Sequence, residues 1–510
     1  MPAAPAPVPA SAPAATRDEA SVLTVLRTPR LLTREALAGL VVALALIPEA
    51  ISFSIIAGVD PRVGLFSSFV MAVSIAFLGG RPAMISAATG AVALVIAPIM
   101  REHGYDHLIA TVLLAGIIQV VLGLLGVARL MRFIPRSVMV GFVNALAILI
   151  FTAQLPHLLG VPWLVYPLVA VGILIMVVMP RLTRVVPAPL VAIVLLTGAV
   201  VALGLQHVPD VGDEGELPRS LPELFLPSVP LTLETLAIIG PTALAMALVG
   251  LLESLMTAKL VDDITDTRSS KTRESWGQGV ANVLSGLFGG MGGCAMIGQT
   301  MINVKASGAR SRVSTFLAGA FLLVLVVVLG DVVAIIPMAA LVAVMVMVSV
   351  ATFDWHSVAP STLRRMPVSE TVVMVVTVAV VVATHNLAIG VIVGVLTAMV
   401  AFARRVARFA SVTREVGEED GVPVARYAVE GELFFASSND LTTQFAYADD
   451  PARVVIDLGR SHIWDASTVA ALDAIETKYA RLGTAVELRG LNVASAGMRE
   501  RLAGRLGAEG

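Results

Sequence analysis

The sequence contains few charged residues, and this shortage excludes whole classes of protein. Asp, Glu, Lys and Arg make up 14% of the 510 residues, whereas 57% are hydrophobic and the mean hydropathy is +0.88. Such a composition excludes an ordinary soluble globular protein and indicates a chain that crosses a membrane many times. The formal net charge of −2 argues against nucleic acid as a partner.

Cysteine is almost absent as well. The single cysteine, Cys294, cannot form an intramolecular disulfide and therefore leaves the redox compartment undetermined. The seven histidines are scattered, and their spacing suggests no metal site. We therefore expect neither a metal nor a cofactor, and no motif in the sequence supports enzymatic activity.

Apolar segments fill most of residues 31–408, which are predicted to form a transmembrane transport domain. The chain begins with an Ala- and Pro-rich stretch that lacks the features of a signal peptide, so residues 1–30 are predicted to be a disordered cytoplasmic leader. About fourteen candidate membrane segments follow. They cover residues 36–57, 63–79, 85–100, 108–127, 138–155, 164–179, 187–205, 236–257, 276–292, 294–304, 313–330, 337–350, 369–384 and 388–403.

The basic residues between these segments predict an orientation. With the N-terminus inside, the inner loops contain fifteen Lys and Arg residues, and the outer loops contain Arg62, Arg101 and Arg219. Cytoplasmic loops of membrane proteins carry an excess of basic residues. The bias therefore supports fourteen segments with the N-terminus and the C-terminal region in the cytoplasm.

Two of the segments contain a single charged residue each, and both charges are glutamates. Glu49 is the one charge within residues 36–59, and Glu253 is the one charge within residues 235–258. A charge near the middle of a membrane helix costs about 2.5–3.5 kcal/mol, and such residues usually face a cavity, an ion pathway or a partner. A bundle with two such carboxylates is predicted to move a solute through the membrane.

The distribution of segments suggests two inverted repeats, about 31–205 and 235–404. The lone carboxylates fall in the first segment of each half, and the third segment of each half, 85–100 or 294–304, is short and contains glycine. Paired short, Gly-interrupted segments at matching positions indicate a transporter's midplane binding site. The alternative is a pair of ordinary helices with poorly predicted ends.

The composition changes after Ala403, where a soluble region of about 412–508 begins. Its pattern predicts the order strand–strand–helix–strand–helix–strand–helix, with RVVIDL at 453–458 as a buried strand. This alternation is typical of a small α/β domain with a mixed sheet.

Four stretches of the chain resemble the SulP anion-transporter family, whose animal members include prestin and pendrin. They are IPEAISFSIIAGVDPRVGLFSSF at 47–69, SAATGAVALV at 86–95, GGCAMIGQTMIN at 292–303 and RVVIDLGRSHIWDAS at 453–467. The resemblance covers nearly the whole chain from about residue 30. It implies a polytopic α-helical, 7+7 inverted-repeat fold like that of uracil permeases, a mobile core and a gate, a cytoplasmic STAS domain, and a homodimer.

The resemblance also implies where the substrate binds. In this family the third and tenth helices are half-length and meet N-terminus to N-terminus. Each helix start exposes unpaired N–H groups and the positive end of its dipole, so two facing starts suit a small anion. The corresponding substrate-binding candidates are Ala88, Thr89, Gly90, Ile297, Gly298, Gln299 and Thr300. Helix packing is the commoner use of small residues in membranes.

Three further positions follow from the resemblance. Animal members carry arginine at the position of Gly298, so this chain has no fixed cation there. Phe53 matches an aromatic residue that lines the family's site, although a packed or lipid-facing phenylalanine is the alternative. Glu49 falls where many relatives have glutamine. Because burial favours the neutral form of a carboxyl group, Glu49 is a candidate proton carrier, with a protonated structural glutamate as the alternative.

Glu253 and Thr257 are four residues apart on one helical face. Sodium-driven family members use an Asp–x3–Thr pair in this region. The glutamate departs from that pattern by one methylene group, so sodium coupling stays an alternative, as does a purely structural contact with backbone amides.

The sequence therefore predicts a proton-coupled secondary transporter of small anions, of the dicarboxylate or bicarbonate class, that works by an elevator mechanism in a bacterial inner membrane. Sodium-coupled bicarbonate or sulfate transport is one alternative. Nucleobase–proton symport would need a carboxylate in the tenth helix, which has none. A membrane sensor that signals through the STAS domain is a third alternative, but Ala466 follows Asp465 where regulatory STAS proteins have a phosphorylatable serine.

Overall fold

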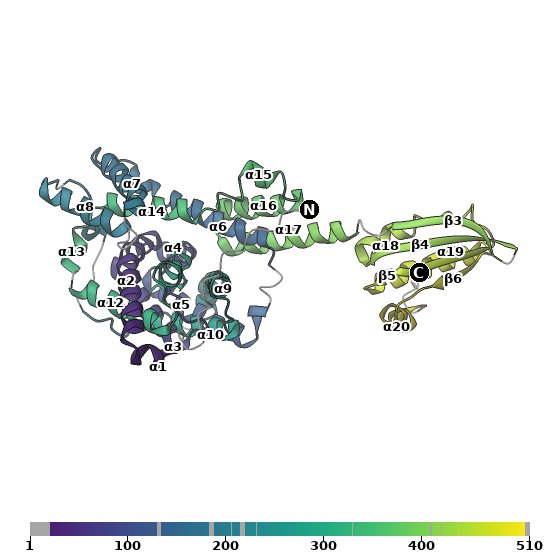
Figure 1. Ribbon diagram of the computed structural model, residues 1–510, viewed down its shortest axis with the longest axis horizontal. Coiled ribbons are helices and arrows are strands. Elements are labelled where there is room, and N and C mark those ends of the chain that lie inside the picture. The colour runs from purple at the N-terminus through teal and green to yellow at the C-terminus, as the bar shows by residue number, and fades with distance from the viewer. Residues whose placement is uncertain are drawn as a thin grey trace, which may run out of the picture. The chain divides into compact units, whose positions relative to one another are not determined.

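The computed structural model describes residues 21–129, 134–182, 188–205, 207–214, 220–230, 232–328, 330–407, 411–419 and 421–504. The chain divides into two compact units, Met1–Val395 and Leu396–Gly510. The first unit is built almost entirely of helices, and the second contains an α/β domain (Figure 1). The division falls inside a long helix, α17.

Helices make up the first unit, and the last of them, α17, continues into the second unit. They are α1 (Val22–Arg27), α2 (Pro29–Ala57), α3 (Pro61–Leu78), α4 (Gly90–His103), α5 (Tyr105–Leu124), α6 (Arg136–Thr152), α7 (Val165–Leu182), α8 (Ala188–Ala202), α9 (Leu233–Thr265), α10 (Lys271–Leu287), α11 (Ile297–Met301), α12 (Arg312–Val328), α13 (Gly330–Ala334), α14 (Met338–Thr352), α15 (Pro360–Leu363), α16 (Val368–Thr384) and α17 (Leu387–Ala407). Short 3-10 helices cover Leu155–Leu158 and Val211–Glu214, and a π-helical turn, Ile302–Ala306, follows α11.

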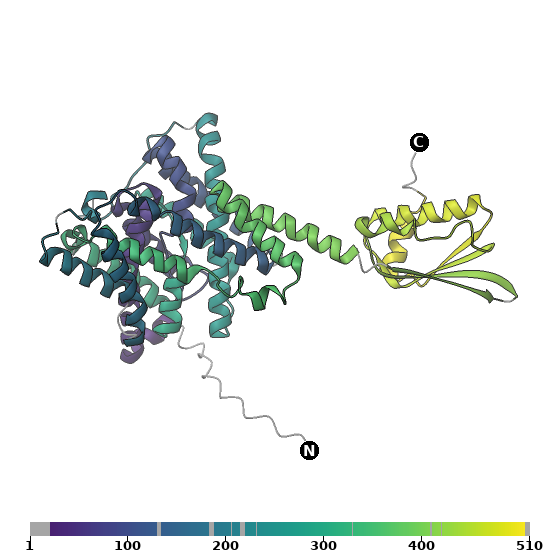
Figure 2. The ribbon, with the colours of Figure 1, turned by 90° about the horizontal axis from the view of Figure 1, so that it is seen from above.

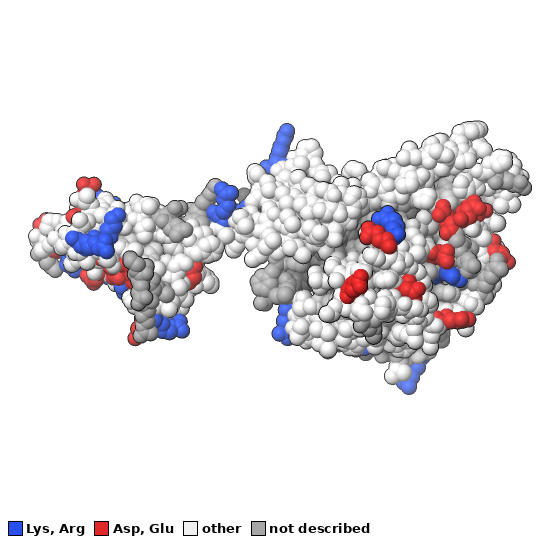
Figure 3. Space-filling model, turned by 180° about the vertical axis from the view of Figure 1, so that it is seen from behind, with Lys and Arg blue, Asp and Glu red and all other residues white. Residues whose placement is uncertain are grey.

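Each of the fourteen predicted segments overlaps a helix. Within the described residues, seven helices are long and apolar enough to cross a membrane, and four shorter helices are also apolar. Broad areas of the helical unit carry no charged side chain on the face drawn in Figure 3, as a lipid-facing surface requires. The fold class of a polytopic helical membrane protein is therefore confirmed, whereas the 7+7 count stays a prediction.

The predicted leader is wrong at its C-terminal end. Residues 21–30 contain α1 and the start of α2, and Val25 is fully buried. Pro29 occupies the first turn of α2, where its missing N–H has no partner to lose, so it begins the helix rather than preventing it. Residues 1–20 lie outside the described residues.

The packing of the helices has the pattern of an internal repeat. If α2 to α5 correspond to α9 to α12, then α5 on α10 is the counterpart of α3 on α12, and both pairs pack in the structure. Likewise α6 packs on α16, and α7 packs on α14. These contacts define a core of α2–α5 and α9–α12 and a gate of α6–α8, α14 and α16.

Two fully buried carboxylates fix the loops that enter the centre of the core. Glu35 on α2 accepts hydrogen bonds from the backbone amides of residues 310 and 311, at 2.8 and 3.2 Å. Glu274 on α10 accepts from the amides of residues 80 and 81, at 2.7 and 3.0 Å. Since several amides satisfy each carboxylate, these buried groups hold the segments before β1 and α12 in place.

The α/β domain has the predicted order of elements. It consists of β3 (Ser411–Glu419), β4 (Val422–Leu433), α18 (Phe435–Leu441), β5 (Arg453–Ile463), α19 (Ala466–Arg481), β6 (Ala485–Arg489) and α20 (Val493–Leu502). The sheet order is β3-β4-β5-β6, with β3 and β4 antiparallel and the other pairs parallel. The long helix α19 lies along the sheet (Figure 2). The predicted mixed sheet is confirmed.

An aspartate orders the aromatic core of this domain. Asp450, whose side chain is fully buried, accepts hydrogen bonds from the hydroxyl groups of Tyr427 (2.6 Å) and Tyr479, and it pairs with Arg414 at 2.7 Å. A buried carboxylate is costly unless it is paired and hydrogen-bonded. All three partners therefore stabilise a charge that would otherwise oppose folding.

Candidate functional site

Two short strands cross at the centre of the core. β1 (Ser86–Ala87) pairs antiparallel with β2 (Cys294–Ala295), although the two lie in different halves of the sequence. Helix α4 begins three residues after β1, and α11 begins two residues after β2. The ladder is only two residue pairs long, so the two helices, which follow its opposite ends, start close together at the crossing. The structure thus has the half-helix pair that the sequence predicts.

Small residues and hydroxyl groups make this crossing possible. A Cβ atom at Gly293 would lie 1.9 Å from the carbonyl oxygen of Ala87, so only glycine allows the strands to approach. The Ala88 amide donates to Ser68 Oγ at 3.2 Å, and the Ile85 amide donates to Thr300 Oγ1 at 3.0 Å. Ala88 and Thr300, predicted as substrate-binding residues, therefore lie buried in the framework of the crossing rather than in the cavity lining.

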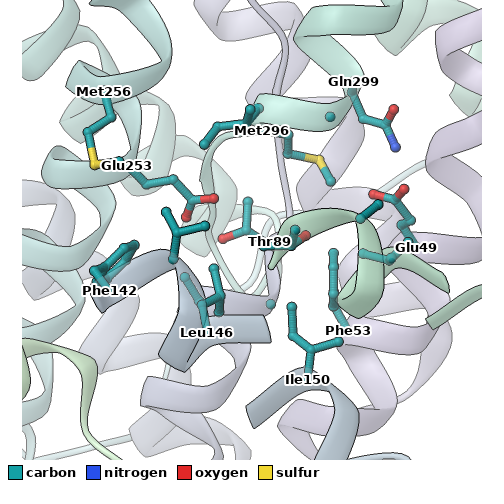
Figure 4. A pocket seen from close by; sticks show the side chains of 18 of the residues that line it. Glu49, Phe53, Thr89, Phe142, Leu146, Ile150, Glu253, Met256, Met296 and Gln299 are labelled. Carbon is teal, nitrogen blue, oxygen red and sulfur yellow. The ribbon is translucent and has the colours of Figure 1, made fainter. Parts of the chain in front are cut away.

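A cavity of about 340 Å³ lies between the helix starts and the gate. Six of the substrate-binding candidates line it: Phe53, Thr89, Gly90, Ile297, Gly298 and Gln299. The predicted coupling residues Glu49 and Glu253 line it as well. In the close-up view the two carboxyl groups lie on opposite sides of Thr89 (Figure 4). The structure therefore brings together eight of the eleven predicted site residues.

Glu49 lies on α2 directly after Pro48, inside the helix. The side-chain amide of Gln299 on α11 lies beside the Glu49 carboxyl group (Figure 4). Gln299 is 1% exposed, and its Oε1 atom has no hydrogen-bond partner in the described part of the chain. One side of the cavity thus places a carboxyl group next to a side-chain amide whose oxygen is buried.

Glu253 lies on α9 at the other side of the cavity and contacts β2. Its Oε2 atom accepts a hydrogen bond from the thiol of Cys294 at 3.0 Å. Thr257, predicted to act with Glu253, does not reach the cavity, because its hydroxyl donates to the backbone carbonyl of Glu253 at 2.8 Å. This bond to the preceding turn is common for threonine in helices. Thr257 is therefore absent from the described cavity lining, and a joint cation site of the pair stays a prediction.

The two cavity glycines differ in the room around them. A Cβ atom at Gly90 would meet Phe53 Cε1 at 2.9 Å and Ile150 Cδ1 at 3.1 Å. A Cβ atom at Gly298 would meet nothing within 4 Å, so this position opens directly on the cavity. The start of α11 is therefore the side from which a ligand can approach the backbone most closely.

Sequence reasoning missed most of the cavity wall. The missed lining residues are Ala91, Phe142, Val143, Leu146, Ile150, Met256, Met296, Ile302, Val348, Ala351 and Thr352. Several come from α6 and α14 of the gate, where apolar residues in an apolar helix give no signal of their own. Cys294, which contacts Glu253, was missed because an isolated cysteine has no pattern.

The chemistry of the lining suits an anion only when its carboxyl groups are neutral. Among the described residues that line the cavity there is no Lys, Arg or His, and the described part of the chain contains no cluster of His, Cys, Asp and Glu that could hold a metal ion. Attraction for an anion must therefore come from the N–H groups at the starts of α4 and α11 and from side-chain donors. Protonated carboxyl groups could act as such donors.

Known proteins similar to this chain are transporters. The model of the sulfate permease family matches residues 32–166 and 162–377, more than half of the chain. The "Putative sulfate transporter YbaR" of Bacillus subtilis (strain 168) is 53% identical over 470 residues, 92% of this chain and 97% of that protein. The bicarbonate transporter BicA of Picosynechococcus sp. is 28% identical over 362 residues, 63% of each chain.

Solved structures that are similar to this chain are also those of transporters. The transmembrane domain of a cyanobacterial bicarbonate transporter, BicA, has a TM-score of 0.61 at 25% identity and covers 72% of this chain and 97% of that chain. SLC26A9 has a TM-score of 0.77 at 17% identity and covers 94% and 88%. The similarity of fold thus extends into the C-terminal α/β domain, in agreement with the predicted STAS domain. The chain belongs to the sulfate permease family, whose members are membrane transporters of anions and not enzymes.

Proposed function

We propose that this protein is a secondary active transporter that carries a small anion across the membrane together with a proton. The observation that carries the proposal is the composition of the cavity. It lies at the starts of α4 and α11, and its two ionisable lining residues among those described are the carboxylic acids Glu49 and Glu253. An anion and two ionised carboxylates would repel one another, so proton uptake by the site has to accompany anion binding.

Glu49 is the proposed proton carrier. It is partly exposed to the cavity, and Gln299 lies beside it on α11, the helix whose open N-terminus would receive the anion. A proton on Glu49 removes a negative charge from the binding site and supplies an O–H donor. Both changes favour anion binding, so the two ligands are thermodynamically linked.

The cavity wall favours an anion of modest size. The named relatives suggest sulfate or bicarbonate as the substrate class. Much of the cavity wall is apolar, with Phe53, Leu146 and Ile150 among its residues. Such a wall could pack against the hydrocarbon part of a dicarboxylate, which sulfate and bicarbonate lack. All three anions are therefore candidates, and dicarboxylate is the one that uses the apolar wall.

An elevator-type motion of the core against the gate would give alternating access. The half-helices and both glutamates belong to the core, whereas α6 and α14 of the gate supply the opposite wall. Movement of the core would carry the whole anion-binding half of the cavity along the gate. The proposal includes a homodimer in a bacterial inner membrane, with the N-terminus and the STAS domain in the cytoplasm.

Uptake into proteoliposomes tests the proposal. Labelled bicarbonate, sulfate and succinate would each be offered with an inward proton gradient, an inward sodium gradient or neither. We expect the proton gradient to drive accumulation of at least one anion. Glu49→Gln should lose this accumulation but still exchange the anion across the membrane, whereas Glu102→Gln, at an exposed position near the end of α4, should behave as the wild type.

Two results would contradict the proposal. Accumulation driven by a sodium gradient alone would mean that sodium, and not the proton, is the coupling ion. Unchanged proton-driven accumulation by Glu49→Gln would remove Glu49 from the mechanism.

A further inference from the structure

A chain of three side chains connects Glu253 to the start of α4. The Cys294 thiol donates to Glu253 Oε2 at 3.0 Å, and its sulfur lies 3.1 Å from Thr89 Oγ1. Thr89 is the N-cap of α4, and its Oγ1 accepts the amide hydrogen of Val92 at 3.4 Å. Cys294 is fully buried, while Glu253 and Thr89 line the cavity at either end of the chain (Figure 4).

The direction of these hydrogen bonds depends on the proton of Glu253. An ionised carboxylate can only accept, so the Cys294 thiol has to donate to it. The sulfur is then free to accept the hydroxyl hydrogen of Thr89, whose oxygen is already used by the Val92 amide. In this state the Thr89 hydrogen is directed at the sulfur and is withheld from the cavity.

A proton on Glu253 permits the opposite direction. The new O–H group can donate to the sulfur, and the thiol hydrogen can rotate about its C–S bond to donate to Thr89 Oγ1. The Thr89 hydroxyl hydrogen then turns away from the sulfur, toward the cavity where the anion would bind. The one covalent bond that forms is the O–H bond of Glu253; the other hydrogens only rotate.

We propose that Cys294 is a positioning residue that couples protonation of Glu253 to the hydrogen bond that Thr89 offers to the anion. The inference rests on the proposed function, because it assumes that an anion binds at the start of α4. It adds a second proton-sensitive group, at the opposite side of the cavity from Glu49. Linkage requires that the bound anion in turn favour the protonated form of Glu253.

Few other groups could produce the same pH dependence. Glu49 of α2 faces Glu253 across the cavity, and Cys294 of β2 contacts it directly. The other elements packed on α9 are α4, α5, α10 and α11, and none of them contributes a described Asp, Glu, His, Lys or Arg to the cavity lining. Variants at Glu49 and Cys294 therefore separate the two proton-sensitive sides.

Sulfate binding to the purified full-length protein tests the coupling, because sulfate keeps its charge from mildly acidic to mildly alkaline pH. The background is Glu49→Gln, which leaves Glu253 as the titrating carboxyl group of the cavity. We expect affinity to fall on the order of tenfold as the pH rises. Adding Cys294→Ala should reduce this change to less than about twofold, whereas Cys294→Ser, which restores a donor and acceptor, should retain it.

Ser254→Ala is the matched control. Ser254 is fully buried, and its Oγ accepts the amide of Ala295, so the variant removes a hydrogen bond to the same strand without touching the chain. It should keep the pH dependence. Equal loss in Ser254→Ala and Cys294→Ala would assign the effect to the stability of β2 and overturn the proposal.

Infrared spectroscopy gives a readout that needs no anion. Cys294 is the only cysteine of the chain, so the S–H stretching band reports this one thiol. We expect the band to shift as the pH is lowered, and the shift to vanish in Glu253→Gln. A band that ignores pH would overturn the inference even if transport is proton-coupled. A shifting band in a protein that binds no sulfate would support the hydrogen-bond chain and count against the proposed function for this anion.

Discussion

The two half-helices of the core begin at the same crossing but differ in how firmly they are held. Helix α4 runs for 14 residues, its N-cap Thr89 accepts the Val92 amide, and Gly90 is packed against Phe53 and Ile150. Helix α11 has only five residues before it becomes a π-helical turn, and its N-cap Met296 provides no side-chain hydrogen bond.

The difference suggests that the two helix starts have separate roles, with α4 stabilising the core and α11 binding the ligand. Capping and packing stabilise the start of α4, so changes there should act mainly on stability. The start of α11 has open space at Gly298 and no side-chain cap, so changes there should act mainly on binding. π-Helical turns are frequent at functional sites, in agreement with this division.

Filling the space at Gly298 should have the largest effect. Gly298→Val would add a branched side chain where a Cβ atom meets nothing within 4 Å, so folding should be unaffected. The side chain would stand between the anion and the backbone amides of α11. We expect anion affinity to fall by more than about tenfold, or 1.4 kcal/mol. Titration binding and thermal unfolding of the same sample check this, and wild-type affinity in a folded variant would exclude α11 from the site.

The equivalent change on α4 should lower the stability of the protein more than its affinity for the anion. In Gly90→Ala the new methyl group would meet Phe53 and Ile150 at 2.9–3.1 Å, and overpacking of this kind costs about 1–3 kcal/mol. We expect a lower unfolding temperature. Phe53→Leu in the same protein should recover part of the loss, because it removes the closest atom. If Gly90→Ala is stable but fails to bind the anion, then the start of α4 would be a binding surface like the start of α11.

The sequence revealed the polar half of this site because membrane burial makes a lone charge visible. Glu49 and Glu253 are each the single charge in an apolar run, and their roles as lining residues follow from the cost of placing a carboxylate in lipid. The order of helices and strands was equally visible, because apolar runs and turn residues alternate along the chain.

The rest depended on information that one sequence does not carry. Thr89 lines the cavity, whereas Thr300 does not. Which threonine lines it depends on where each helix begins after its strand, and this distance differs by one residue between α4 and α11. Phe142 and Ile150 form part of the wall, yet they look like any apolar residue in an apolar helix. The link through Cys294 joins residues 89 and 253, which are distant in sequence and meet only through the pairing of β1 with β2.

A smaller change at α11 sharpens the comparison. Gln299→Met keeps the length of the side chain but removes its amide, which lies beside Glu49 (Figure 4). Gln299 lines the cavity, where its N–H groups could donate to the anion, and the loss of one such hydrogen bond costs about 1 kcal/mol, so we expect anion affinity to fall about fivefold with little change in stability. Uptake kinetics and thermal unfolding provide the measurement. An equal loss of both would mean that Gln299 supports the fold rather than the ligand.

The smallest effect on this comparison should come from the C-terminal α/β domain. Among the described residues, none that lines the cavity belongs to the C-terminal α/β domain. Deletion of residues 411–510 should therefore leave the ranking of bicarbonate, sulfate and succinate unchanged, although it should lower the transport rate or the expression level, because a domain joined to moving helices can bias their equilibrium. Asp450→Ala provides a full-length counterpart, since it leaves Tyr427 and Tyr479 without their shared acceptor. Uptake of the same three anions by both variants decides the matter: a changed ranking would mean that selectivity is not set by the two half-helices alone.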